Sequence, residues 1–281
     1  MKKMKMNGKV ALITGASSGI GAALAREYGR LGAEVVLSAR RVDRLESLVE
    51  ELEASGCSAL AVPCDVTRDG DPERAVEAAI ERFGRIDHVQ ANAGFGVAGW
   101  FHKLGVEDYR RQFDTNVFGV IRTVGAVREA LIESRGCLAL MGSVNSYVAL
   151  PGTSPYSMSK HAVMALAGSL RHEFGVHGVS VTLVAPGFVD SEIRQVDNQG
   201  RHTGNTVDPI PDWLRMDAMT AARKIVRGVS RRRRVVLVTG HGKAIVFLQR
   251  HFPGFTEFLV RRVGVRGRKE PKGGVHRTGL A

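Results

Sequence analysis

Residues 10–21, V-A-L-I-T-G-A-S-S-G-I-G, decide the fold of this chain. The first five residues form a continuous apolar run, which is typical of a parallel strand buried on both faces. The run leads directly into a glycine-rich turn, and a helix is expected over residues 20–31. Gly15, Gly19 and Gly21 permit a tight turn and close packing of helix on strand, and the first N–H groups of the helix can bind a phosphate. The stretch therefore predicts the start of a dinucleotide-binding fold.

Apolar runs and helical patterns continue to alternate after this stretch. We expect strands over 34–39, 58–63, 86–91, 137–141, 179–184 and 235–239, and helices over 43–55, 71–83, 155–175 and 221–229, with helical segments within 106–133. Ser154, before Pro155, and Thr220 are the expected N-caps of the last two helices. This alternation predicts an α/β fold: a doubly wound, Rossmann-type parallel sheet of about seven strands with helices on both faces.

Positive charge is concentrated near the C-terminus. The net charge is +12, and residues 222–281 carry sixteen lysines and arginines against two acids, so the rest of the chain is close to −2. We predict a single catalytic domain over 1–240 and a basic, amphipathic helical extension over 241–281. Residues 243–262 have the pattern of two short helices broken at a Pro-Gly pair, and the Gly/Arg/Lys-rich end is expected to be disordered.

Composition narrows the class of protein. Three cysteines without metal-ligand spacing argue against a disulfide framework and favour a reducing compartment. The N-terminus leaves no space for a signal-peptide core, and no run approaches the roughly 20 apolar residues of a spanning helix. We expect a cytoplasmic protein, possibly peripheral at a membrane, with no metal site. No nucleic-acid partner is expected, because no recognised binding motif or platform of stacking aromatics is present.

The second decisive stretch runs from Ser143 to Lys160. Tyr156 and Lys160 are four residues apart, so they share one face of the expected helix. An ammonium beside a phenol favours the phenolate, so we expect the tyrosine pKa to be lowered towards neutrality, where the group could act as a general acid or base. Ser143 ends a strand and could return beside the tyrosine to hydrogen-bond a carbonyl or alcohol oxygen.

Together these motifs resemble those of the short-chain dehydrogenases/reductases over about residues 8–240. The motifs in family order are the glycine turn, Asn92-Ala93-Gly94, Asn116, Tyr156-x-x-x-Lys160 and Pro186-Gly187, although Ala91 replaces the first asparagine of the usual N-N-A-G. The resemblance implies an oxidoreductase that interconverts a carbonyl and an alcohol. It also implies a homodimer or homotetramer, and a mobile substrate lid over about 190–219.

The resemblance assigns roles to individual residues. It implies that Tyr156 passes the proton, that Lys160 lowers its pKa and binds the nicotinamide ribose, that Ser143 polarises the substrate oxygen and that Asn116 positions a relay water. The cofactor-binding residues that it implies are Gly15, Ser17, Ser18, Gly19, Ile20, Gly21, Arg40, Arg41, Asp65, Val66, Asn92, Ala93, Gly94, Tyr156, Lys160, Pro186, Gly187, Val189 and Ser191. Within this set, Asp65 is expected to accept from the adenine amino group, Asn92 to tie the central strand to its neighbours, and Ser191 to contact the carboxamide.

The end of the second strand indicates the cofactor. In dinucleotide folds an acid near this point holds the ribose 2′-hydroxyl, whereas an arginine accommodates a 2′-phosphate. Ala39 stands where the acid would be, followed by Arg40 and, as a secondary positive charge, Arg41. We therefore predict NADP(H), although both arginines could simply solvate the start of the next helix.

The substrate is predicted only as a class. Apolar residues expected around the pocket are Phe95, Val97, Trp100, Phe101, Val148, Leu150, Phe188, Trp213 and Met216, which favours a lipophilic ketone, aldehyde or alcohol. One alternative is a 3-oxoacyl-[acyl-carrier-protein] reductase-like enzyme, because a basic surface attracts an acidic carrier protein. Another is a catalytically idle NADP(H)-binding scaffold. Residues 243–262 are expected to lie on an anionic membrane, cover a partner subunit or pack on the protein itself.

Overall fold

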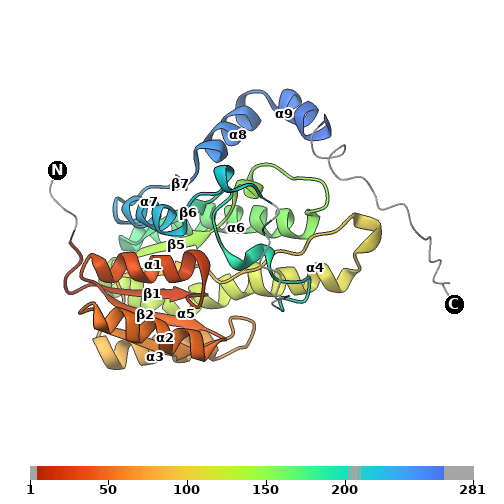
Figure 1. Cartoon of the computed structure of the whole chain (residues 1–281). Helices are drawn as coiled ribbons and strands as arrows, with labels where there is room; N and C mark the ends of the chain where they lie inside the picture. Colours follow the sequence, from red (N-terminus) through yellow and green to blue (C-terminus); the bar gives the residue numbers. More distant parts are fainter. Residues whose placement is uncertain (1–4, 202, 204–207, 209, 263–281) are drawn as a thin grey trace.

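A parallel sheet forms the centre of the protein. The computed structural model describes residues 5–201, 203, 208 and 210–262 (Figure 1). Among these, seven parallel strands are ordered β3-β2-β1-β4-β5-β6-β7. Their bounds are β1 (Val10–Thr14), β2 (Glu34–Ala39), β3 (Ala59–Pro63), β4 (His88–Ala91), β5 (Cys137–Met141), β6 (Ser180–Ala185) and β7 (Val235–Leu237). The predicted doubly wound parallel sheet is confirmed.

Helices cover both faces of the sheet and build two separate cores. One face carries α1 (Gly19–Arg30), α2 (Val42–Ala54) and α7 (Ala218–Ser230), and the other carries α3 (Asp71–Phe83), α5 (Gly119–Ser134) and α6 (Ser154–Glu173). Every residue of β1 and of β5 is buried, as expected for strands covered on both sides. The continuous apolar runs of the sequence therefore correspond to the central strands.

The topology fixes where a ligand can bind. The chain passes from β1 outwards to β2 and β3, and then returns to β4 on the other side of β1 (Figure 1). In open α/β sheets the binding crevice lies at such a switch point, beyond the carboxyl ends of the strands. The glycine turn after β1 and the Asn-Ala-Gly segment after β4 both lie at this edge.

Two predicted helix caps are wrong. α7 begins at Ala218 and its N-cap is Asp217, whose carboxylate accepts a hydrogen bond from the Thr220 N–H (2.8 Å). Thr220 is therefore the donor in this cap. α6 begins one residue earlier than expected, at Ser154, whose hydroxyl is 2.6 Å from the Tyr109 hydroxyl instead of capping the helix.

The segment after the sheet forms two short helices, α8 (Gly240–His251) and α9 (Pro253–Val260), which stand out from the body in Figure 1. Within the described part of the chain, no helix has the length and apolar character needed to span a membrane. The predicted disordered end, 263–281, lies outside the described residues, as do residues 202, 204–207 and 209 of the predicted lid.

Candidate active site

The glycine turn after β1 forms an anion cradle. Gly15 and Gly19 have φ angles of +67° and +51°, which favour glycine. A Cβ at Gly21 would overlap the Gly15 carbonyl oxygen, so the chain can turn this tightly only without a side chain there. α1 follows the N-cap Ser18, and Ala22 N–H donates to the Ser18 carbonyl (3.2 Å). The N–H groups before Ala22 lack acceptors within the helix, so the cradle fits the pyrophosphate of a dinucleotide.

Asn92 joins the ends of the two switch-point strands. Its side-chain amide donates to the Thr14 carbonyl (2.9 Å), and its backbone N–H donates to the Thr14 hydroxyl (3.0 Å). Ala93 N–H donates to the same hydroxyl (3.1 Å). The expected tie between central strands is present. Sequence reasoning missed Thr14, which has no signal beyond its place as the last residue of β1.

Ser143 and Tyr156 form the hydroxyl pair of the site. Ser143 caps a short 3-10 turn after β5, and its Oγ accepts from the Asn145 N–H (3.1 Å). The Ser143 side chain acts on Tyr156 in the direction that favours the phenolate, but burial is the larger effect and raises the Tyr156 pKa above its ordinary value. The phenol therefore keeps its proton at neutral pH in this state of the protein.

Lys160 lies one helical turn beyond Tyr156, as the spacing predicted. Its Nζ donates to the Met141 carbonyl (2.7 Å) and is 5.6 Å from the centroid of the Tyr156 ring. Burial lowers the Lys160 pKa to about 8. The expectation that this ammonium lowers the Tyr156 pKa in the free protein is wrong, because the ammonium is bonded to the end of β5 and desolvation of the phenol dominates.

Asn116 lies in a π-helical turn, Asp114–Phe118, between α4 (Val106–Phe113) and α5. The regular α-helical hydrogen-bond pattern is thus interrupted around Asn116. The side-chain oxygen of Asn116 accepts from Phe95 N–H (3.1 Å), and its amide donates to the Phe95 carbonyl (3.0 Å) and to the Ser159 hydroxyl (3.2 Å). A Cβ at Gly94 would be 2.9 Å from the Asn116 side-chain oxygen and 3.7 Å from Lys160 Nζ, which places Asn116 beside the lysine.

Comparison with known proteins identifies the family. Residues 9–202 match the family described as short chain dehydrogenase. The chain is a short-chain dehydrogenase/reductase. It is 43% identical over 188 residues to an A-factor type γ-butyrolactone 1′-reductase of Streptomyces virginiae, a match that covers 66% of this chain and 73% of the relative. It is 33% identical over 277 residues to 11-β-hydroxysteroid dehydrogenase A of Sesamum indicum, covering 94% and 78%. The protein is accordingly an oxidoreductase of alcohol and ketone substrates.

Solved structures of the family superpose over nearly the whole chain. A short chain dehydrogenase/reductase from Burkholderia phymatum in complex with NAD has a TM-score of 0.77 at 26% identity, covering 97% of this chain and 99% of that one. A short-chain dehydrogenase from Sphingobium yanoikuyae in complex with NADPH has a TM-score of 0.71 at 28% identity, covering 96% and 99%. The dehydrogenase fold therefore accounts for nearly the whole chain. One of these neighbours is in complex with NAD and the other with NADPH.

Arg41, one of the two arginines expected near the adenosine end of the cofactor, contacts the glycine turn. Ala39 is buried at the end of β2, and Arg40 is exposed. Arg41 Nη2 lies 3.1 Å from the Ser17 hydroxyl of the glycine turn and 2.8 Å from a carboxylate oxygen of Glu192. Sequence reasoning ranked Arg40 first and missed Glu192, which is 151 positions away.

The other predicted cofactor residues of the dehydrogenase lie around this edge. Ile20 packs against the core, Val66 is buried, and the Pro186 carbonyl accepts from Val144 N–H (2.9 Å). The Asp65 carboxylate accepts from the Thr67 N–H (3.0 Å) and hydroxyl (2.8 Å), which stabilises the turn after β3. Its expected contact with adenine stays a prediction.

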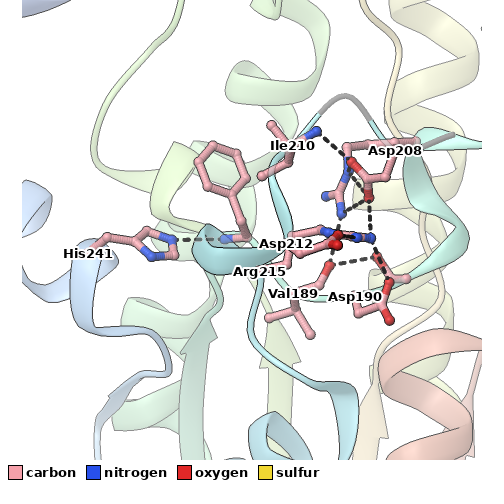
Figure 2. Close-up of polar contacts among 10 residues, drawn as sticks. Val189, Asp190, Asp208, Ile210, Asp212, Arg215 and His241 are labelled. Atoms are coloured by element: carbon pink, nitrogen blue, oxygen red, sulfur yellow. Dashed lines mark hydrogen bonds and ion pairs between the residues drawn. The ribbon is translucent and has the colours of Figure 1, made fainter.

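The loop after β6 is held from two sides. Ser191 lies against the glycine turn, since a Cβ at Gly19 would be 2.9 Å from the Ser191 Cβ. On the other side, His241 Nε2 accepts from the Phe188 N–H (3.0 Å; Figure 2), and a Cβ at Gly187 would overlap this imidazole. Sequence reasoning missed His241, and its position at the start of α8 carries no motif that could have identified it.

An ion-pair cluster lies in the segment between β6 and α7 over which the lid is predicted. Asp208, with a side chain 4% exposed, pairs with Arg194 (2.5 Å) and with Arg215 (3.4 Å), and accepts from Ile210 N–H (2.9 Å; Figure 2). These partners hold the pKa of the Asp208 carboxyl below its ordinary value. Arg194 also exerts a positive field on Tyr156 that favours the phenolate. Sequence reasoning missed the whole cluster.

The predicted pocket residues divide into two groups. Phe95, Trp100, Phe188 and Met216 are half-buried and Val97 and Val148 are buried, whereas Leu150, Phe101 and Trp213 are 38%, 78% and 82% exposed. Trp213 and Phe101 are therefore surface residues in this structure, and their expected place around the substrate pocket stays a prediction. Sequence reasoning missed Gln112, whose side-chain oxygen accepts a hydrogen bond from the Val97 N–H (2.6 Å). Gln112 lies four positions before Asn116, and this spacing on one helix face could have identified it.

Proposed function

We propose that this short-chain dehydrogenase/reductase uses NADP(H) to interconvert a lipophilic carbonyl compound and its alcohol. The observation that carries the proposal is the placement of Tyr156 and Lys160 together, with Lys160 Nζ 5.6 Å from the Tyr156 ring and bonded to the Met141 carbonyl at the end of β5, at the edge of the sheet that holds the glycine cradle. A bound nicotinamide supplies or accepts the hydride. The protein's task is to orient the substrate oxygen and move one proton at that atom.

Tyr156 is the proposed proton donor for carbonyl reduction. Burial raises its pKa, so the phenol is protonated at neutral pH and can give its proton to an oxygen that becomes negative. Ser143 is the proposed second hydrogen-bond donor to that oxygen. As the phenol loses its proton, the positive charges of Lys160 and Arg194 favour the phenolate that remains.

Asn116 is proposed to position a water molecule that relays the proton. Its side chain fixes the Phe95 backbone through two hydrogen bonds of 3.0–3.1 Å, and it also contacts Ser159. The π-helical turn around it interrupts the regular α-helical hydrogen-bond pattern. Carbonyl groups released by that interruption are the proposed anchor for a relay water beside Lys160.

Three observations support NADP(H). No acid stands at Ala39 to repel a 2′-phosphate, Arg41 already reaches the glycine turn at Ser17, and Arg40 is exposed beside it. A guanidinium can bind a phosphate through two parallel hydrogen bonds. The structural neighbours contain NAD in one case and NADPH in the other, so the preference is proposed from Ala39 and the two arginines.

The proposed lipophilic substrate class rests on the half-buried Phe95 and Phe188 and the buried Val148. It agrees with the names of two relatives, an A-factor type γ-butyrolactone 1′-reductase and an 11-β-hydroxysteroid dehydrogenase. The alternative substrate is a 3-oxoacyl group on an acyl-carrier protein, because a basic C-terminal extension attracts an acidic carrier protein.

The test is kcat/KM for NADPH and NADH over a panel of steroid, lactone-type and 3-oxoacyl carbonyl compounds. We expect NADPH to be preferred by about 10- to 100-fold, the value of one good arginine–phosphate contact. Ala39→Asp combined with Arg40→Ala and Arg41→Ala should reverse the preference, and Tyr156→Phe should abolish turnover while NADPH still binds. Turnover by Tyr156→Phe above about a tenth of wild type would contradict the tyrosine assignment. Equal use of both cofactors would contradict the cofactor assignment.

A further inference from the structure

An exposed aromatic surface covers the outer side of α8 and α9. Phe247, Phe252, Phe255 and Phe258 are 56%, 54%, 52% and 51% exposed. Phe255 and Phe258 are three residues apart on α9, so they are neighbours on its surface, and Phe252 is the residue immediately before this helix. Half of a phenylalanine side chain is roughly 100 Å², so the four rings together approach the size of the largest apolar patches on ordinary monomers. We call these four residues the aromatic face.

α8 packs on the body of the protein, and α9 packs on α8. Val246 of α8 is 1% exposed, and a Cβ at Gly242 would be 2.8 Å from Val144, so α8 lies on the turn that follows Ser143. On α9, Thr256 is 5% exposed, and this helix packs on α8. Figure 1 shows α9 as the outermost helix of the molecule. Among the described residues, packing on the protein itself therefore accounts for the inner side but leaves the aromatic face exposed.

Basic side chains lie beside the aromatic face. Lys243, Arg261 and Arg262 are exposed. Arg250 is also exposed, but its guanidinium lies 5.2 Å from the centroid of the Tyr147 ring, so it faces the body of the protein. The guanidinium of Arg262 lies 5.8 Å from the centroid of the Phe258 ring, so positive charge and aromatic surface are immediate neighbours. Over residues 241–281 the sequence has nine lysines and arginines against two acids.

This charge pattern indicates whether a second copy of the chain or an anionic lipid surface covers the aromatic face. In a twofold contact between copies, the same patch faces itself, so these arginines would approach their own symmetry mates. An anionic lipid surface attracts the same groups instead. Helices with aromatic residues on one side and lysine or arginine around it lie in the headgroup region, with the apolar side towards the acyl chains.

We propose that α8 and α9 form an attachment site for an anionic lipid surface. The four rings of the aromatic face enter the boundary between headgroups and acyl chains, and Lys243, Arg261 and Arg262 contact lipid phosphates. Because α8 also packs on the turn after Ser143, attachment holds the active-site edge of the sheet close to the lipid. The attachment itself does not depend on the proposed cofactor or substrate.

Flotation of the full chain with phosphatidylcholine vesicles, with and without phosphatidylserine, tests the proposal. Phe255→Ser with Phe258→Ser removes half of the aromatic face, and Arg261→Glu with Arg262→Glu reverses its charge without touching a buried group. Val176→Ser is the matched control, because Val176 is 80% exposed on a different part of the surface. Circular dichroism and thermal unfolding verify that each variant is folded, and light scattering reports its oligomeric state.

We expect wild type and Val176→Ser to float with phosphatidylserine vesicles and to bind vesicles of phosphatidylcholine alone far more weakly. Each double variant should lose binding by about tenfold or more, and binding should weaken as salt is added. The proposal is overturned if wild type does not float, or if both double variants float like wild type. It is also overturned if the phenylalanine variant only converts an oligomer into monomers, since that result assigns the aromatic face to a second copy.

Discussion

Lys160 shows that the environment of a residue decides its chemistry as much as its spacing in the sequence. The spacing of four places it one helical turn from Tyr156, and this geometry is present. The direction of its ammonium is set by the Met141 carbonyl, 2.7 Å away at the end of β5. A sequence pattern does not contain this partner or the burial that raises the tyrosine pKa and lowers that of the lysine to about 8. The two residues could be predicted from the sequence, but the directions of their pKa shifts could not.

Glu192 provides a prediction at the scale of one residue. Its carboxylate is 2.8 Å from Arg41 Nη2, the arginine that reaches Ser17 of the cofactor cradle. A 2′-phosphate bound there competes with this carboxylate for the same guanidinium. Glu192→Gln should therefore raise kcat/KM for NADPH by roughly twofold to fivefold, as expected for a partly exposed ion pair, and change that for NADH little. Glu46→Gln, at an exposed position on α2, is the control. An unchanged ratio of NADPH to NADH use would show that the two anions do not compete.

At the scale of elements, the sequence predicts what local physics determines. The strand Val10–Thr14 and the helix Asp71–Phe83 have the predicted bounds, because apolar runs and periodicity mark their buried surfaces directly. The N-caps of α6 and α7 were missed, because capping depends on which of several neighbouring polar residues has the non-helical backbone. The lid was recognised only as an irregular segment. Its contacts join Asp208 to Arg194, fourteen positions away, and no periodic pattern relates these residues.

The lid's ion-pair cluster gives a prediction for that element. Asp208 is almost fully buried between Arg194 and Arg215, so Asp208→Asn leaves two guanidinium groups facing a neutral amide. Loss of one member of a buried pair is strongly unfavourable. We expect the lid to loosen, KM for the carbonyl substrate to rise about tenfold or more, and trypsin to cleave faster within 190–219. Asp190→Asn is the control, because Asp190 contacts Arg215 at 3.2 Å but is 66% exposed. The lid assignment fails if the two variants behave alike.

At the scale of the whole molecule, a buried polar chain links a covering helix to the centre of the sheet. Gln90 of β4 donates to the Tyr28 hydroxyl of α1 (2.7 Å), and this hydroxyl is 3.3 Å from His88 Nδ1. With the tyrosine hydroxyl as donor, Nδ1 is the acceptor, which requires a neutral imidazole. Burial, the largest effect, lowers the His88 pKa to about 4, although Asp87 acts in the opposite direction. The packing of helix on sheet is therefore coupled to the protonation of one core histidine.

This coupling predicts how global stability depends on pH. Because the folded pKa of about 4 lies below the ordinary histidine value of 6.5, the unfolded chain binds more protons between these two values. The contribution of His88 is complete above pH 6.5 and is lost as pH falls towards 4; its size is at most about 3 kcal/mol. Urea unfolding of wild type at pH 7 and pH 4.5 should show most of this loss. His88→Asn, which remains neutral, should show much less, whereas His172→Asn, at an exposed position on α6, should follow wild type. Carboxylates such as Asp208, whose pKa is lowered by its arginine partners, lose their contribution only at lower pH, so the window from 6.5 to 4.5 reports mainly on histidine. If His88→Asn loses as much stability as wild type over this window, the buried chain is not the group that titrates.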